Sequence, residues 1–164
     1  MDSRPVPPEY MKAGSDYLEA LRALGLTPDF LGWGWETPAS QWLLVLVTSI
    51  IDAGGPLALN RLLFQAYNAK ATPKEISPFI VRVFSPEVIP DDFYLLGEHR
   101  LTIVSATGDK EEPGKIVENV QRVFLGTELE MINSYQNMPM RRLSYHQRRE
   151  NWNRFRRNVE KLAA

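Results

Sequence analysis

The sequence predicts an α+β domain: a small mixed sheet of three to four strands, helices packed mainly on one face, and a basic amphipathic helix at the C-terminus. Three observations support this prediction. From Trp42 until Thr48 the residues are apolar at both odd and even positions, which is typical of a strand buried on both faces. A helical stripe and a second strand follow, and such strand–helix–strand units normally join parallel strands. The final residues combine helical spacing with many arginines.

The first helix is predicted from apolar residues at helical spacing: Tyr10, Tyr17, Leu21 and Leu24. Pro8 can occupy its first position, and Gly14-Ser15 offers a second start with Ser15 as the N-cap. We expect Gly25 to end the helix in the left-handed conformation, which would fold Leu26 back on Leu21.

The centre of the sheet is expected at Trp42 to Ile51. A buried helix that opens at Pro38 is the alternative, because hydrophobic periodicity alone does not separate the two. The β-branched and aromatic composition favours the strand. The preceding segment, Gly32 to Trp35, is predicted as a loop or a short strand.

Further elements are predicted downstream. A helix over 56–67 has its apolar stripe at Leu59, Leu62, Leu63 and Ala66. Two more strands are expected over 79–84 and 100–105, and a charged surface loop, 107–114, precedes a helix over 116–124. The pattern over 127–140 does not distinguish helix from strand.

The charged residues are distributed unevenly along the chain. From Arg141 onward there are eight basic and two acidic side chains, a net charge of +6, whereas the preceding residues carry eleven basic and eighteen acidic side chains, a net charge of −7. We therefore divide the chain into an N-terminal arm (1–12), an α+β globular domain (13–140) and a basic C-terminal helix (141–164) that packs on the domain or on a partner.

The C-terminal helix has a recognisable start and an apolar seam. Ser144 and Gln147 match a capping box, in which each side chain bonds the other residue's backbone N–H. The seam consists of five residues at three- and four-residue spacing: Tyr145, Trp152, Phe155, Val159 and Leu162. Only Arg148 interrupts it. A seam of this kind must be buried, because exposed tryptophan and phenylalanine are costly in water.

Composition excludes several classes of protein. The 164 residues have the length of one domain and contain no cysteine, which excludes disulfides, thiol nucleophiles and thiolate metal sites. The N-terminus lacks the apolar segment of a signal peptide, and the longest apolar run is shorter than the ~18 residues that a membrane-spanning helix needs. We therefore expect a soluble cytoplasmic protein with no membrane partner.

Candidate acid–base residues lie near predicted strand ends, where α/β sites often collect: Glu36, Asp52, Asp91, Asp92 and Glu98. No spacing marks a catalytic pair among them, and roles in turns or caps explain the three aspartates. The two histidines, His99 and His146, lack the spacing of metal ligands. The sequence therefore predicts no catalytic residue, no metal and no cofactor.

Two other motifs have both a structural and a functional interpretation. Gly54-Gly55-Pro56 could present helix N–H groups to an anion, but it lacks the lysine and the glycine spacing of a phosphate loop, so a plain turn is favoured. Trp33, Trp35 and Trp42 could form a stacking surface. Closing one end of the core is the favoured role.

The basic helix is the strongest functional lead, because arginines bind carboxylates and phosphates with two-pronged geometry. The first hypothesis is a non-enzymatic interaction module that uses this helix on an acidic protein partner or on a second copy of the chain. The second is a nucleic-acid-binding protein, which a sequence pI of about 6.1 disfavours. The third is a small hydrolase-type enzyme with a carboxylate site at the strand ends. The predicted partner-binding residues are Arg148, Arg149, Trp152, Arg154, Phe155, Arg156 and Arg157.

Overall fold

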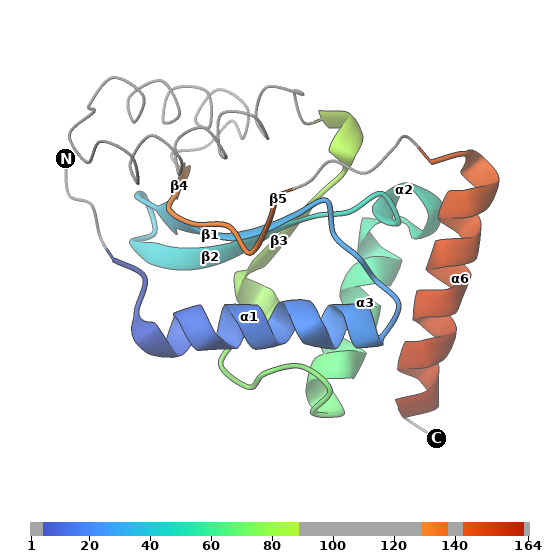
Figure 1. The fold of residues 1–164 in the computed structure, drawn as a ribbon, viewed down its shortest axis with the longest axis horizontal. Coiled ribbons are helices and arrows are strands. Elements are labelled where there is room, and N and C mark those ends of the chain that lie inside the picture. The colour runs from blue at the N-terminus through green and yellow to red at the C-terminus, as the bar shows by residue number, and fades with distance from the viewer. Residues whose placement is uncertain (1–4, 89–128, 138–142, 163–164) are drawn as a thin grey trace.

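The computed structural model describes residues 5–88, 129–137 and 143–162. Three long helices and five strands form two layers, with α1 and α3 beneath the sheet and α6 at its end (Figure 1). The elements are, in chain order, α1 (Pro8–Ala23), β1 (Phe30–Glu36), β2 (Gln41–Val47), α2 (Ile51–Gly54), α3 (Pro56–Asn68), the 3-10 turn η1 (Pro78–Ile80), β3 (Val81–Phe84), the 3-10 turn η2 (Pro86–Val88), β4 (Leu129–Met131), β5 (Gln136–Asn137) and α6 (Tyr145–Leu162).

The sheet is mixed and has the order β3-β2-β1-β4. Strands β1 and β2 form an antiparallel hairpin, whereas β3 pairs with β2 in parallel after the α3 crossover. The short strands β4 and β5 both pair with β1 on the edge opposite β2, at different points along it. Over the described residues the sheet is therefore four strands wide, within the predicted range of three to four.

Strand β2 is buried on both faces. Leu44 and Leu46 face the helices and belong to the main hydrophobic cluster, whereas Val45 and Val47 belong to a second cluster on the other face. All four side chains are fully buried. This confirms the predicted central strand and excludes a helix opening at Pro38.

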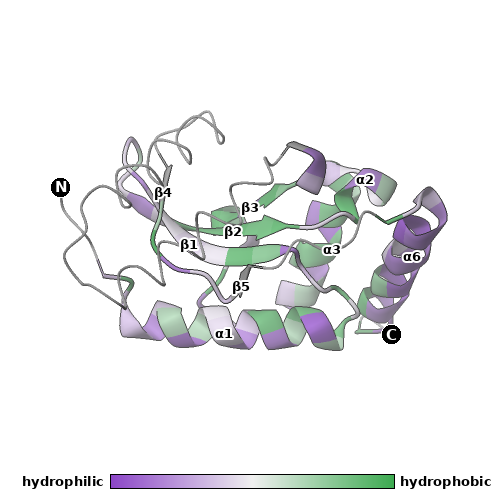
Figure 2. Ribbon diagram, turned by 45° about the horizontal axis from the view of Figure 1, so that its top comes forward, coloured by the Kyte–Doolittle hydropathy of each residue, from purple (hydrophilic) through white to green (hydrophobic). Residues whose placement is uncertain are grey.

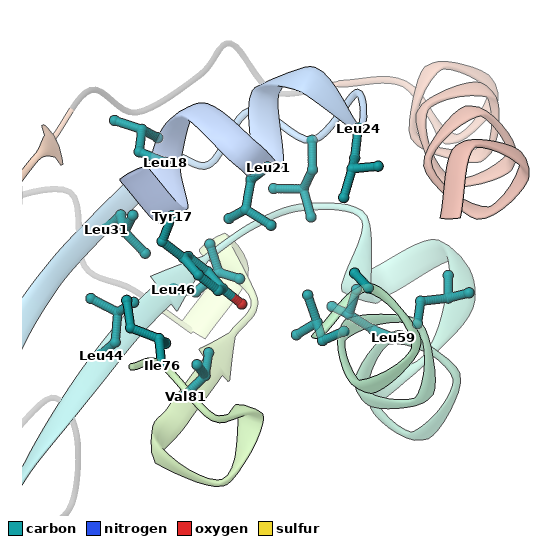
Figure 3. Packing of buried hydrophobic residues seen from close by; sticks show 14 of the residues in the cluster. Tyr17, Leu18, Leu21, Leu24, Leu31, Leu44, Leu46, Leu59, Ile76 and Val81 are labelled. Carbon is teal, nitrogen blue, oxygen red and sulfur yellow. The ribbon is translucent and has the colours of Figure 1, made fainter. Parts of the chain in front are cut away.

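The main cluster joins the helices to one face of the sheet. Tyr17 and Leu21 of α1 point toward Leu44 and Leu46 of β2, and Leu59 of α3 closes the cluster from the side (Figure 3). The helical side chains follow the predicted spacing, because buried residues recur every three or four positions along α1 and α3. The predicted α+β class with helices mainly on one face is confirmed.

The end of α1 also matches its prediction. Gly25 has φ of +92°, the N–H of Gly25 donates to Arg22 O at 3.0 Å, and the N–H of Leu26 donates to Leu21 O at 2.9 Å. This pair of bonds is the Schellman motif, which returns the chain over the last helical turn.

Two predicted boundaries require correction. Helix α1 runs without a break from Pro8, as one of the two predicted starts had it, so the second start with Ser15 as the N-cap is wrong. Gly14 lies inside the helix and directly beneath the ring of Tyr135, which a side chain at this position would overlap. Strand β2 ends at Val47 rather than Ile51, because the Thr48 hydroxyl accepts from the Ile50 N–H at 3.5 Å and starts a turn.

Two other segments differ in extent from their predictions. Gly32 to Trp35 lies inside a seven-residue strand, β1. The predicted strand over 79–84 begins only at Val81, because Ser77 accepts from the Phe79 N–H and caps a 3-10 turn. The ambiguous stretch 127–140 contributes β4 and β5. The predicted strand at 100–105, loop at 107–114 and helix at 116–124 lie outside the described residues.

Because side chains of β2 belong to both hydrophobic clusters, shortening one of them should lower the stability of the domain. We expect Leu46→Ala or Leu44→Ala to lower the free energy of unfolding by ~2–5 kcal/mol, since each removes three buried carbons and leaves a cavity. Urea unfolding measures this. Leu57→Ala is the matched control, because Leu57 is 64% exposed and should change stability by less than ~0.5 kcal/mol. Equal effects at the three positions would contradict the buried-strand assignment.

Candidate functional site

Helix α6 begins at a complete capping box. The Ser144 hydroxyl accepts from the Gln147 N–H at 3.1 Å, and the Gln147 side-chain oxygen accepts from the Ser144 N–H at 2.9 Å. One turn further on, Arg148 forms a 3.3 Å ion pair with Glu87 of η2. This contact accounts for the arginine in the apolar seam, because its side chain is 21% exposed and its charge is neutralised by the body.

The inner face of α6 belongs to the core of the domain. Trp152, Phe155 and Val159 are buried within the main hydrophobic cluster. The indole of Trp152 lies directly on Gly54 at the end of α2, where any added methyl group would overlap the ring. A glycine is therefore required at this position by close approach, since its neighbour Gly55, not Gly54, has the positive φ.

The second half of α6 is held by the end of α1. Asn158 donates from its side-chain nitrogen to Leu24 O at 2.9 Å. Leu24 is the C-cap of α1, so this bond satisfies a carbonyl at a helix end. The aliphatic part of Arg154 covers Gly25 in the same turn. Helix α6 therefore contacts α1, α2 and α3 and is anchored along its length.

The outer face of α6 is strongly basic. Along its polar side the helix is coloured hydrophilic in Figure 2. Five basic side chains are exposed there: Arg149, Arg154, Arg156, Arg157 and Lys161. We call these five residues the arginine face. Its charge is partly offset by Glu150 and Glu160, the two acidic residues of the helix.

Contacts within α6 divide the arginine face into two rows. Arg149 donates to the Tyr145 hydroxyl at 2.9 Å, and Arg156 lies 3.9 Å from Glu160. Arg154, Arg157 and Lys161 are spaced three and four residues apart and make no ion pair within the described part of the chain. These three cations are therefore available to an external anion.

The predicted partner-binding residues occupy two different environments. Trp152 and Phe155 are buried in the domain and cannot touch a partner in this conformation. Arg148 is engaged with Glu87, whereas the other four arginines are exposed. At the ends of the seam, Tyr145 and Leu162 remain 61% and 40% exposed. Lys161 belongs with the exposed arginines, and the sequence reasoning did not include it.

The candidate acidic residues that the structure describes do not form a common site. Glu36 accepts from the Gln41 side chain at 2.7 Å at the hairpin end of β1. Asp52 accepts from the Ser85 hydroxyl at 2.9 Å at the opposite end of β2. Asp91, Asp92, Glu98 and His99 lie outside the described residues, and His146 pairs with Glu150 on α6. Across residues 5–88, 129–137 and 143–162, no three acidic or histidine side chains gather as metal ligands would.

The tryptophans are mainly structural. Trp33 is completely buried, stacks on Tyr10 at 5.0 Å, and donates from its indole nitrogen to the Tyr135 hydroxyl at 3.0 Å. The Tyr135 hydroxyl in turn donates to Met11 O at 2.8 Å, and partial burial raises the pKa of this phenol. Trp35 and Trp42 meet edge to face across the hairpin. This network joins α1 to the segment after β4 and leaves no free tryptophan surface at Trp33.

Comparisons with protein-family models, with curated proteins and with solved structures give no match. Among the helices that the structure describes, none has the length and apolar character needed to cross a membrane.

The two sides of α6 should respond differently to substitution. We expect Phe155→Ala to lower the free energy of unfolding by ~3–5 kcal/mol, because its ring is fully buried. Arg157→Ala should change it by less than ~0.5 kcal/mol, because this side chain is exposed. Urea unfolding of both variants provides the comparison. Similar losses for the two would show that α6 is not packed as described.

Proposed function

We propose that this chain is a non-enzymatic interaction module that binds an acidic protein partner through the arginine face of α6. The proposal rests on one observation: the two sides of α6 lie in different environments, one buried and one exposed. The apolar side is buried in the core of the domain. The opposite side presents Arg154, Arg157 and Lys161, which make no ion pair among the residues that the structure describes.

The rigidity of α6 supports this proposal. The helix is fixed by the Trp152 contact with Gly54, by the Arg148–Glu87 ion pair and by the Asn158 bond to Leu24. A fixed helix presents its guanidinium groups with less loss of conformational entropy on binding than a free helix would. Paired carboxylates of an acidic surface match the fork geometry of arginine.

The same geometry weighs against the other hypotheses. Stacking on single-stranded nucleic acid uses several exposed aromatic rings beside the arginines. Trp152 and Phe155 are buried, which leaves Tyr145 as the exposed ring of the seam, next to Arg149. Association with a second copy through the apolar seam is not needed, because the domain itself buries the centre of the seam. Glu36 and Asp52 lie at opposite ends of the hairpin, which does not support a carboxylate site between them.

We expect the intact chain to bind a short fluorescent Glu-rich peptide at low ionic strength, with affinity that falls as salt increases. Fluorescence anisotropy measures this. The double variant Arg154→Ala/Arg157→Ala should bind about two- to thirtyfold more weakly, since each exposed charge pair contributes ~0.2–1 kcal/mol. The control Lys12→Ala/Lys74→Ala removes the same charge from exposed positions elsewhere and should change the affinity less than twofold or so.

The outcomes separate the hypotheses. Equal losses in both double variants would show that binding follows net charge and not the arginine face. Tighter binding of single-stranded or duplex oligonucleotides than of the peptide, abolished by the same arginine substitutions, would replace the proposal by nucleic-acid binding. No binding of either probe would contradict the proposal.

A further inference from the structure

A second exposed surface lies on α3 and η1 and is apolar. Phe79 is 75% exposed and Leu57 is 64% exposed, the two highest values among the large hydrophobic residues that the structure describes. The ring of Phe64 meets that of Phe79 edge to face, with centroids 5.0 Å apart. Leu57 precedes Phe64 by seven residues, so both lie on the side of α3 away from the core. We call Leu57, Phe64 and Phe79 the α3–η1 patch.

Phe79 is held in this exposed position by its backbone. Its N–H donates to the Ser77 hydroxyl at 3.3 Å, and its carbonyl accepts from Arg82 at 2.7 Å. The edge contact with Phe64 further fixes the ring. An aromatic side chain fixed in this way loses little freedom when a partner covers it, which is the property of residues that dominate binding energy at interfaces.

The charged residues around the α3–η1 patch are mostly basic. Arg61 lies between Leu57 and Phe64 on α3, and Arg82 is bonded to the backbone of Phe79. Between Asp52 and Glu87 the chain has a single acidic residue, Glu75, and four basic ones, Arg61, Lys70, Lys74 and Arg82. The hydrogen bond from Lys12 to Asp16 is the main cause of the raised pKa of Lys12, and Glu75 adds a smaller contribution.

We infer that the α3–η1 patch is a docking site for a segment of a partner protein that carries an apolar side chain flanked by carboxylates. The apolar side chain would cover Phe79 and Phe64, and the carboxylates would pair with Arg82 and Arg61. Charge complementarity selects this occupant over a basic peptide, which the two arginines would repel. The inference concerns a surface separate from the arginine face and does not depend on it.

The test is a selection from a library of random peptides displayed on phage, with the intact chain as bait and Phe79→Ser as the counter-bait. We expect the selected peptides to combine an aromatic or branched aliphatic residue with aspartate or glutamate nearby. Synthetic versions should bind at least about tenfold more weakly to Phe79→Ser, and several-fold more weakly to Arg82→Gln. Phe79 is exposed, so the serine variant should keep its urea midpoint.

Two controls make the result specific. Leu162→Ser removes another partly exposed apolar side chain and should leave peptide affinity unchanged. Arg154→Ala/Arg157→Ala should also bind the peptides normally, which separates this inference from the proposed function. Selected peptides that are basic, that lack apolar residues, or that bind Phe79→Ser equally well would overturn the inference. A concentration-dependent dimer that Phe79→Ser disrupts, or binding of anionic vesicles through Phe79, would also overturn it.

Discussion

The indole of Trp152 rests on Gly54, and the placement of α6 depends on this contact. A tryptophan can approach another helix this closely only where the opposite residue has no side chain. With the indole in place, Phe155 and Val159 enter the main cluster one and two turns later. Asn158 then reaches the C-cap carbonyl of α1. The exposure of Arg157 follows from these contacts, because residues on the opposite side of a packed helix must face solvent. The side chain of Arg154 is exposed as well, although its aliphatic part covers Gly25.

Much of the fold could be predicted because its strongest signals are local. Apolar residues at both odd and even positions indicated the buried strand β2. A glycine after apolar residues at helical spacing indicated the Schellman turn at Gly25. Boundaries that tertiary contacts decide were predicted less well. Gly14 lies inside α1 against the ring of Tyr135, 121 positions away in the chain, and no local pattern indicates this contact. After the early end of β2, the Ile50 N–H donates to the Thr48 hydroxyl and the Asp52 N–H donates to Ser49 O.

The candidate site was predictable in composition but not in geometry. Charge counting identified the basic helix, and the capping box identified its start. Which arginines are free could not be predicted, because Arg148 is neutralised by Glu87, 61 residues earlier in the chain. Phe79 was assigned to a strand because its neighbours are apolar, and the cap at Ser77 turns this residue outward instead. The two surfaces therefore differ: one was indicated by the sequence, and the other required the structure.

The central claim, that α6 is fixed by the contact of Trp152 with Gly54, is tested most directly by a double-mutant cycle in urea. Gly54→Ala should cost ~1–3 kcal/mol in the parent protein, because the added methyl group overlaps the indole. It should cost less than ~0.5 kcal/mol in a Trp152→Leu background, where the ring is gone. Gly55→Ala is the control, since its positive φ makes alanine unfavourable in both backgrounds and no neighbour lies within 4 Å of the added carbon. Equal costs for Gly54→Ala with and without Trp152 would contradict the account.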